Sequence, residues 1–310
     1  MDDVIKVGGA MSLQSLYGCG TALVTPFEAD GSLDEAGLRA LIEWQIEQGI
    51  HFLVPCGSTG EAATLSLDEH LRVVEITVEQ AGGRVPVVAG AGNNDTAKCI
   101  DLCRAVAACG ATHLLVVSPA YNRPPQRGLI AHFEAVADAV DVPILLYNVP
   151  GRTACNLEAA TTLALAEHPR VIGIKEASGD LDQINEVILK RPDGFSVFSG
   201  DDPLTLPIMA LGAEGVVSVV SNAAPRGMSD LVNAMQQGDL VRARQLQAEL
   251  FELMMAAFVE SNPIPIKAAL AELGRIGATV RSPLTPLTEA HRATVEAAMS
   301  GLMDSAEAGA

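Results

Sequence analysis

One lysine in this sequence has the surroundings expected of a nucleophile. Lys175 ends the apolar run at residues 171–174 (VIGI), so its ammonium group is expected in or beside a nonpolar interior. Burial disfavours the charged form of a lysine, and a neutral amine can attack a carbonyl carbon to form a Schiff base. Other interpretations stay open on this context alone. The lysine could bind phosphate, extend to solvent, or pair with Glu176 or Asp201.

Other polar side chains also follow apolar runs. Tyr147 ends one run, and its hydroxyl could move protons or simply complete a core aromatic. Ser58 and Thr59 lie between glycines in a tight turn, where hydroxyls bind a carboxylate, relay a proton or cap a helix. Arg152 follows a second turn, and its guanidinium matches a carboxylate, although a surface salt bridge is its commoner use.

The elements that must position these side chains are eight short apolar runs separated by segments of helical periodicity. Continuous apolar runs are typical of strands buried on both faces of a parallel sheet. The runs lie at residues 21–24, 52–56, 85–89, 113–117, 143–147, 171–175, 195–199 and 215–219. Plausible helix N-caps are Asp34, Asp68, Asp95 and Asn156.

Eight alternations in about 200 residues predict an α/β fold, a (β/α)8 TIM barrel with a C-terminal helical extension. An open doubly wound sheet is the alternative, but the Gly-rich turn at residues 90–95 lacks the third glycine of a dinucleotide fingerprint. The expected division is an N-terminal extension at 1–15, a barrel at 16–227 and a helical subdomain at 228–310. Barrel active sites lie at the C-terminal ends of the strands, where Lys175, Tyr147 and Ser58 all fall.

The composition excludes several classes of function. Apolar residues make up 49% of the 310 residues, enough for a large core, and the formal net charge of −18 disfavours nucleic acid and anionic membranes as partners. The six cysteines form no CxxC pair and the six histidines no HExxH motif, so neither a metal site nor a disulfide is expected. The N-terminus lacks a signal-peptide core, and the protein is expected in the cytoplasm.

Six motifs in order give the chain a family resemblance. They are GSTGE (57–61), YNRP (121–124), YNVPGRT (147–153), GIKEASGD (173–180), SGDD (199–202) and NPIPIK (262–267). With them the chain resembles the dihydrodipicolinate synthase / N-acetylneuraminate lyase family, from about residue 16 to residue 303.

The resemblance implies a class I aldolase. Pyruvate would form an imine with Lys175, the imine would become an enamine, and the enamine would attack an aldehyde. Tyr147 would be the acid/base, with Ser58 linking it to Tyr121, which in this family reaches into the neighbouring subunit. No metal or other cofactor is implied, because the protonated imine is the electron sink. A homo-oligomer is implied, usually a dimer of dimers.

The resemblance also implies the binding residues. Ser58 and Thr59 would hold the pyruvate carboxylate, and the backbone at Gly200 and Val217 would line the pocket. Arg152 matches the arginine with which the synthase branch binds the carboxylate of L-aspartate-4-semialdehyde, giving 4-hydroxy-tetrahydrodipicolinate for lysine biosynthesis. A lyase or dehydratase of the same family acting on a longer 2-oxo or sugar acid is the alternative.

Two further points follow from the resemblance. A non-catalytic binding barrel is disfavoured because Lys175, Tyr147, Ser58, Tyr121 and Arg152 are all retained. Lysine-inhibited members bind lysine with a His, a Glu and a Tyr, among others, and the matching positions here are Leu67, Lys98 and Ala120. Insensitivity to lysine is therefore expected, since Lys98 would repel the ligand's ammonium group.

Overall fold

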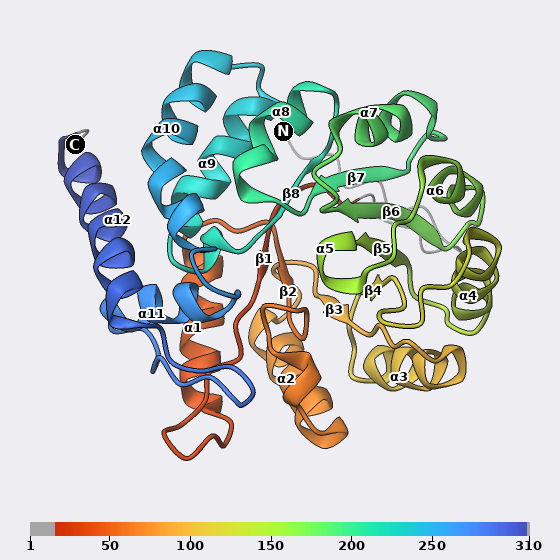
Figure 1. Ribbon diagram of the computed structural model, residues 1–310, viewed down its shortest axis with the longest axis horizontal. Helices are drawn as coiled ribbons and strands as arrows, with labels where there is room; N and C mark the ends of the chain where they lie inside the picture. Colours follow the sequence, from red (N-terminus) through yellow and green to blue (C-terminus); the bar gives the residue numbers. More distant parts are fainter. Residues whose placement is uncertain (1–15, 309–310) are drawn as a thin grey trace.

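The computed structural model describes residues 16–308, in which eight parallel strands form a barrel (Figure 1). The strands run in the order β2-β1-β8-β7-β6-β5-β4-β3, and a parallel bridge between Leu53 and Val87 joins the two ends of this row. The predicted (β/α)8 barrel is confirmed, and the open doubly wound sheet was wrong. The strands are β1 (Gly18–Ala22), β2 (Phe52–Val54), β3 (Val88–Gly90), β4 (His113–Val117), β5 (Ile144–Asn148), β6 (Val171–Glu176), β7 (Ser196–Ser199) and β8 (Gly215–Ser218). The expected extension at residues 1–15 lies outside the described residues.

Helices surround the strands and connect each to the next (Figure 1). They are α1 (Glu35–Glu47), α2 (Leu67–Ala81), α3 (Thr96–Ala108), α4 (Gln126–Asp138), α5 (Pro150–Thr153), α6 (Ala159–Ala166), α7 (Leu181–Lys190), α8 (Thr205–Ala210) and α9 (Pro225–Gln236). Short 3-10 turns η1 (Ala62–Thr64), η2 (Asp202–Leu204) and η3 (Val220–Asn222) follow β2, β7 and β8. The periodicity did not predict α5, a single turn directly after β5.

Two of the four expected N-caps are confirmed. The carboxylates of Asp34 and Asp95 accept hydrogen bonds from the first turns of α1 and α3. Helix α2 begins after Ser66 instead of Asp68, because Ser66 and Glu69 form a reciprocal capping box that satisfies two backbone N–H groups.

The predicted cap at Asn156 is wrong. Helix α6 begins after Glu158, which makes no side-chain cap. The Asn156 amide instead contacts Asn148, in β5, and Gln183, in α7. Because the Asn156 side chain is bonded to these two residues, it cannot also cap α6. The sequence pattern alone therefore placed the cap too early.

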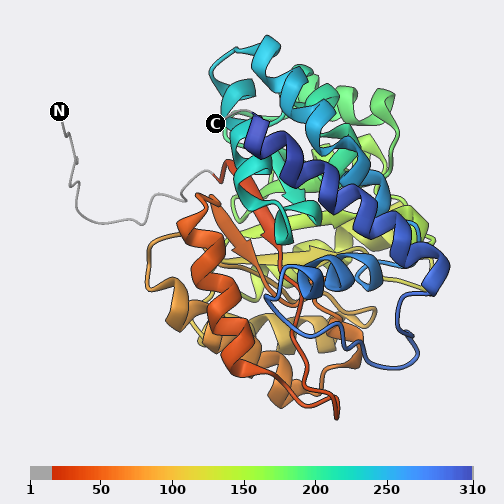
Figure 2. The ribbon, with the colours of Figure 1, turned by 90° about the vertical axis from the view of Figure 1, so that its left-hand side faces the viewer.

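The C-terminal helices lie to one side of the barrel (Figures 1 and 2). Helix α9 packs on β1 and β8 and completes the outer ring, so the expected boundary at 227/228 falls inside this helix. Beyond it, α10 (Leu240–Ala256) packs on α9, and α12 (Glu289–Ala308) packs on α10 and on α11 (Ile264–Glu272). The NPIPIK motif begins in the loop before α11, at Asn262, and runs into the first turn of that helix, where Lys267 lies.

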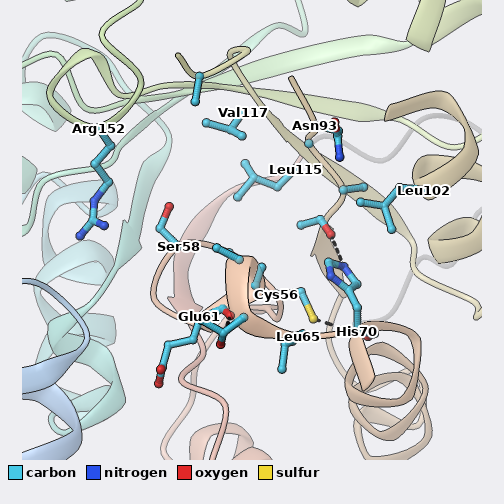
Figure 3. A pocket seen from close by; sticks show the side chains of 18 of the residues that line it. Cys56, Ser58, Glu61, Leu65, His70, Asn93, Leu102, Leu115, Val117 and Arg152 are labelled. Carbon is cyan, nitrogen blue, oxygen red and sulfur yellow. Dashed lines mark hydrogen bonds between the residues drawn. The ribbon is translucent and has the colours of Figure 1, made fainter. Parts of the chain in front are cut away.

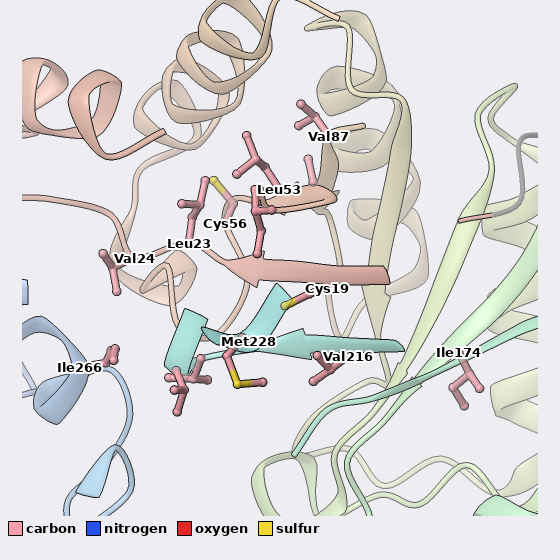
Figure 4. Close-up of a cluster of buried hydrophobic side chains, with 14 of the residues drawn as sticks. Cys19, Leu23, Val24, Leu53, Cys56, Val87, Ile174, Val216, Met228 and Ile266 are labelled. Atoms are coloured by element: carbon pink, nitrogen blue, oxygen red, sulfur yellow. The ribbon is translucent and has the colours of Figure 1, made fainter. Parts of the chain in front are cut away.

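Two apolar clusters hold the barrel together. The inner cluster fills the barrel and includes Phe52, Phe198 and Tyr147. The outer cluster lies between the strands and the helices, and Figure 4 shows Met228 of α9 and Ile266 of α11 in it with side chains of the strands. A rigid double-layered core fixes where the strand ends stand. Across residues 16–308, no helix is long and apolar enough to cross a membrane.

Candidate active site

Lys175 and Tyr147 lie side by side at the C-terminal ends of β6 and β5. The two residues are paired in the parallel register, so their side chains point to the same face of the sheet, the inside of the barrel. Lys175 is 5% exposed and Tyr147 6%, and the Lys175 Nζ lies 4.3 Å from the centre of the Tyr147 ring. An amine and a phenol are therefore held in contact inside a largely apolar enclosure.

The buried amine has no acidic partner among residues 16–308. Glu176 follows Lys175 but points to the other face of the strand. There its carboxylate accepts hydrogen bonds from Asn148, Ser178 and Gln183, while burial raises its pKa. No ion pair joins Lys175 to Glu176 or Asp201 in the described part of the chain. The alternatives of a solvent-reaching or ion-paired lysine are thus wrong.

Gly200 lies beside the stem of Lys175, and Val217 lies in the core of the barrel. A Cβ on Gly200 would lie 3.0 Å from the Cε of Lys175 and 2.8 Å from the Cβ of Ala177, so the absence of a side chain there makes room for the lysine stem. Val217 is fully buried in the inner cluster with Tyr147 and Phe198. Neither residue is among those that line the cavity at this end of the barrel, so their role in the pocket stays a prediction.

A cavity of about 980 Å³ opens at this end of the barrel. Its volume lies near the top of the range for small-molecule sites, about 300–1,000 Å³. Tyr147, Ser58 and Arg152 all line it, and Figure 3 shows Arg152 and Ser58 entering it from different elements. Ser58 and Arg152 are exposed in the isolated chain, so both can contact a molecule that enters.

Thr59 is buried beside the cavity and held by the C-terminal extension. Its side-chain oxygen, in a residue 3% exposed, accepts a hydrogen bond of 2.8 Å from the side-chain amide of Asn262. The main-chain carbonyl of Asn262 accepts a hydrogen bond of 3.2 Å from Nη2 of Arg152. One residue of the loop before α11 thus contacts both Thr59 and Arg152.

A buried ion pair also holds the turn that carries Ser58 and Thr59. Nζ of Lys267, in α11, lies 2.5 Å from Oε1 of Glu61, and both side chains are almost fully buried. The second carboxylate oxygen of Glu61 accepts the backbone N–H of Arg281, while Lys267 also donates to the carbonyl of Thr279. Burial lowers the pKa of Lys267 to about 8, and the Glu61 carboxylate opposes that shift. The turn that carries Ser58 and Thr59 is therefore tied to α11.

Within the single chain, Tyr121 does not lie with the other predicted site residues. Its side chain is 89% exposed, and its backbone has a φ of 71°, in the left-handed region that residues other than glycine rarely adopt. Among the described residues, no hydrogen bond links the hydroxyls of Tyr121, Ser58 and Tyr147. A strained and exposed aromatic beside a cavity points to a role that involves another surface.

The three positions matched to lysine binding all belong to the cavity. Leu67, Lys98 and Ala120 line it, and Leu67 and Lys98 are exposed. These positions therefore contribute one cation and two apolar side chains to the cavity lining.

Three residues of the site were missed by reasoning from residue types, namely Asn262, Glu61 and Lys267. Glu61 closes the GSTGE motif, and Asn262 and Lys267 lie at the two ends of NPIPIK, so the motifs themselves were the available signal. Across residues 16–308, no group of three His, Cys, Asp or Glu side chains could hold a metal ion.

Comparisons with known proteins show the family of the chain. Residues 15–302 match the model of the dihydrodipicolinate synthetase family. The 4-hydroxy-tetrahydrodipicolinate synthase of Koribacter versatilis is 53% identical over 94% of this chain and 98% of its own. The Acinetobacter baumannii dihydrodipicolinate synthase solved with pyruvate has a TM-score of 0.91 and 42% identity, with 93% and 99% of the two chains covered. A structure described as the first monomeric dihydrodipicolinate synthase variant has a TM-score of 0.92 and 39% identity, with 93% and 97% covered.

Proposed function

The chain belongs to the dihydrodipicolinate synthetase family, and from that premise we propose that it condenses pyruvate with L-aspartate-4-semialdehyde through an imine on Lys175. The product is 4-hydroxy-tetrahydrodipicolinate, and the enzyme is a lyase of lysine biosynthesis. The observation that carries the assignment of Lys175 is its burial beside Tyr147, without an acidic partner in the described chain, at the mouth of the barrel. A biosynthetic role also fits the cytoplasmic location expected from the sequence.

The chemistry begins at the lysine amine. Nζ attacks C2 of pyruvate, a C–N bond forms, and the carbonyl oxygen leaves as water to give the imine. The protonated imine withdraws electrons, so C3 loses a proton and the enamine forms. C3 then attacks the aldehyde carbon, and the new alkoxide takes up a proton. Attack of the amino group of the second substrate on C2 closes the ring and releases Lys175. The imine is the electron sink, so no cofactor is required in this proposal.

Tyr147 is proposed as the acid/base of these steps. It is the phenol in contact with the lysine, and it also lines the cavity into which pyruvate must enter. Positioned proton donors of this kind contribute about 10²–10⁴-fold to rate. Ser58, which lines the same cavity, is proposed to pass the proton onward to Tyr121.

The carboxylates of the two substrates are proposed to bind on different sides of the cavity. Ser58 and Thr59 would hold that of pyruvate, at the turn after β2, with the backbone at Gly200 and Val217 closing the pocket around the imine. Arg152, on α5, would hold that of the aldehyde, because a guanidinium pairs with a carboxylate through two parallel hydrogen bonds. Relatives at about half identity over nearly the whole chain favour this aldehyde over a longer sugar acid.

A second copy of the chain is proposed to complete the site, in a homo-oligomer built as a dimer of dimers. The support is the exposure of Tyr121 and its left-handed backbone, which hold the ring away from its own barrel. A two-fold interface would place each Tyr121 at the partner's site, because such an interface repeats every contact twice.

Trapping of the imine tests the proposal. Wild-type protein treated with pyruvate and borohydride should gain one pyruvyl group by intact mass, and Lys175→Ala should gain none. Lys190→Ala, which removes an exposed lysine, is the matched control and should still be labelled. Failure of the correctly folded wild type to form an adduct would remove Lys175 as the nucleophile. Product analysis with a panel of aldehydes then separates the synthase from a sugar-acid lyase.

A further inference from the structure

Asn262 contacts both of the groups proposed to bind carboxylates, although it belongs to the C-terminal extension. Its side-chain nitrogen donates to Oγ1 of Thr59 at 2.8 Å, and its main-chain carbonyl accepts from Nη2 of Arg152 at 3.2 Å. Asn262 itself is only 6% exposed and lines the cavity. Both contacts of Asn262 therefore lie inside the site.

The contact with Thr59 determines where the threonine hydrogen points. A threonine hydroxyl has one hydrogen to donate and two lone pairs that accept. In the orientation that the structure gives the Asn262 amide, its N–H occupies one lone pair of the Thr59 hydroxyl, and its buried Oδ1 has no partner among the described residues. No acceptor among residues 16–308 takes the hydrogen of Thr59. That hydrogen is left for an acceptor from outside the described chain, and two neighbours of Thr59, Ser58 and Asn262, line the cavity. A hydroxyl that is itself hydrogen-bonded in this way is also a stronger donor.

The position of Asn262 is fixed independently of its own side chain. Lys267 lies in the helix that follows the Asn262 loop, and its ammonium group pairs with Glu61 in the turn that also holds Thr59. The loop and the turn are therefore held together at two points. Loss of the Asn262 amide would remove the hydrogen bond to Thr59 while the buried ion pair kept the loop in place.

We propose that Asn262 is a positioning residue that turns the Thr59 hydroxyl toward the carboxylate of pyruvate, while its main-chain carbonyl steadies Arg152. The inference rests on the proposed function, because it takes Thr59 and Arg152 as the carboxylate-binding groups. It assigns to the C-terminal extension a part in substrate binding. The side-chain contact, to Thr59, would affect the binding of pyruvate. The main-chain contact, to Arg152, would affect the binding of the aldehyde.

Two variants of the assembled full-length enzyme test this division. Asn262→Ala removes only the side-chain contact, so the KM for pyruvate should rise about tenfold, the effect of one hydrogen bond of about 1.4 kcal/mol. The KM for the aldehyde should change little, because the main-chain carbonyl remains. Asn262→Asp has the same shape but offers only acceptors, so Thr59 would donate to it and turn away from pyruvate, and the KM for pyruvate should rise further.

A double-mutant cycle separates positioning from a general loss of structure. In a Thr59→Val background the hydroxyl is gone, and Asn262→Ala should then leave the KM for pyruvate unchanged. Equal rises in both KM values, or additive effects in the cycle, would overturn the inference. The isosteric Asn262→Asp keeps the test decisive if Asn262→Ala unfolds. Borohydride trapping on the wild type distinguishes a failure of the proposed function from a failure of the role proposed for Asn262. A wild type that traps pyruvate with an unchanged Asn262→Ala KM refutes only the role of Asn262.

Discussion

At the scale of single residues, the position of Lys175 depends on a missing side chain and on a carboxylate that points away from it. Gly200 has no side chain where the lysine stem passes, and Glu176 is turned away and satisfied by three donors of its own. The amine lies over the ring of Tyr147, which belongs to the inner apolar cluster of the barrel. The amine is therefore placed at a strand end without a carboxylate bonded to it among the described residues, which is the arrangement that the proposed attack on a carbonyl needs.

We expect free lysine to leave the activity unchanged. Leu67, Lys98 and Ala120 line the cavity, and the exposed Lys98 would meet the ammonium group of the amino acid as a like charge. Initial rates over a range of lysine concentrations, with calorimetry, provide the measurement. Lys98→Glu is the matched variant, and any weak binding of lysine should strengthen in it. Inhibition of the wild type at low lysine concentration would show that the expectation is wrong.

At the scale of elements, the turn after β2 and helix α11 behave as one unit. The turn carries Ser58 and Thr59, and it is tied to α11 by the ion pair between Glu61 and Lys267. Glu61 also has a left-handed backbone, with a φ of 53°, which needs tertiary contacts to hold it. The C-terminal extension is thus part of the structure that positions the site.

Lys267→Met should destabilise the fold strongly. Removal of one partner of a buried ion pair leaves an unpaired charge, which costs about 3–5 kcal/mol. The midpoint of urea unfolding gives the measurement, and Glu61→Gln added to Lys267→Met should recover part of the loss because no charge is then left unpaired. Lys190→Met is the control, since the exposed pair of Lys190 with Glu186 is worth at most about 1 kcal/mol. Similar losses in the Lys267 and Lys190 variants would mean that the buried pair has no special weight.

At the scale of the whole molecule, one residue proposed for catalysis, Tyr121, does not lie in the site of its own chain. Tyr121 is 89% exposed, and Leu67, at the edge of the cavity, is 57% exposed. The proposed dimer of dimers would cover side chains at such positions. The assembly is therefore where the proposed proton relay would be completed.

Mixed oligomers should test this arrangement. Tyr121→Phe and Lys175→Ala are each expected to lose most activity alone. Co-expressed, they should regain activity, because a site with an intact Lys175 would receive an intact Tyr121 from its partner. Co-expression of Tyr121→Phe with Tyr121→Phe/Lys175→Ala is the control and should regain none. No recovery in demonstrated mixed oligomers would place Tyr121 outside the neighbouring site.

Local pattern was enough to predict the barrel and the end of it that carries the site. Eight apolar runs alternating with helical segments could be satisfied by a closed parallel sheet, and in such a sheet all strand C-termini meet at one end. Lys175, Tyr147 and Ser58 were therefore predicted at one end of the barrel from their positions at strand ends alone. The helix starts at Asp34 and Asp95 were also predictable, because an N-cap is a contact between residues three apart.

Only the tertiary structure decided the contacts between distant parts of the chain. Asn262 meets Thr59 across 203 positions, and Lys267 meets Glu61 across 206. Such pairs depend on how the C-terminal helices pack on the barrel, which no local periodicity records. The same reason explains the misplaced cap at Asn156, whose amide is used by Asn148 and Gln183. By itself the sequence determined the elements and the end where the chemistry lies, because those follow from neighbouring residues. The packing of the folded chain decided which side chains hold that chemistry in place.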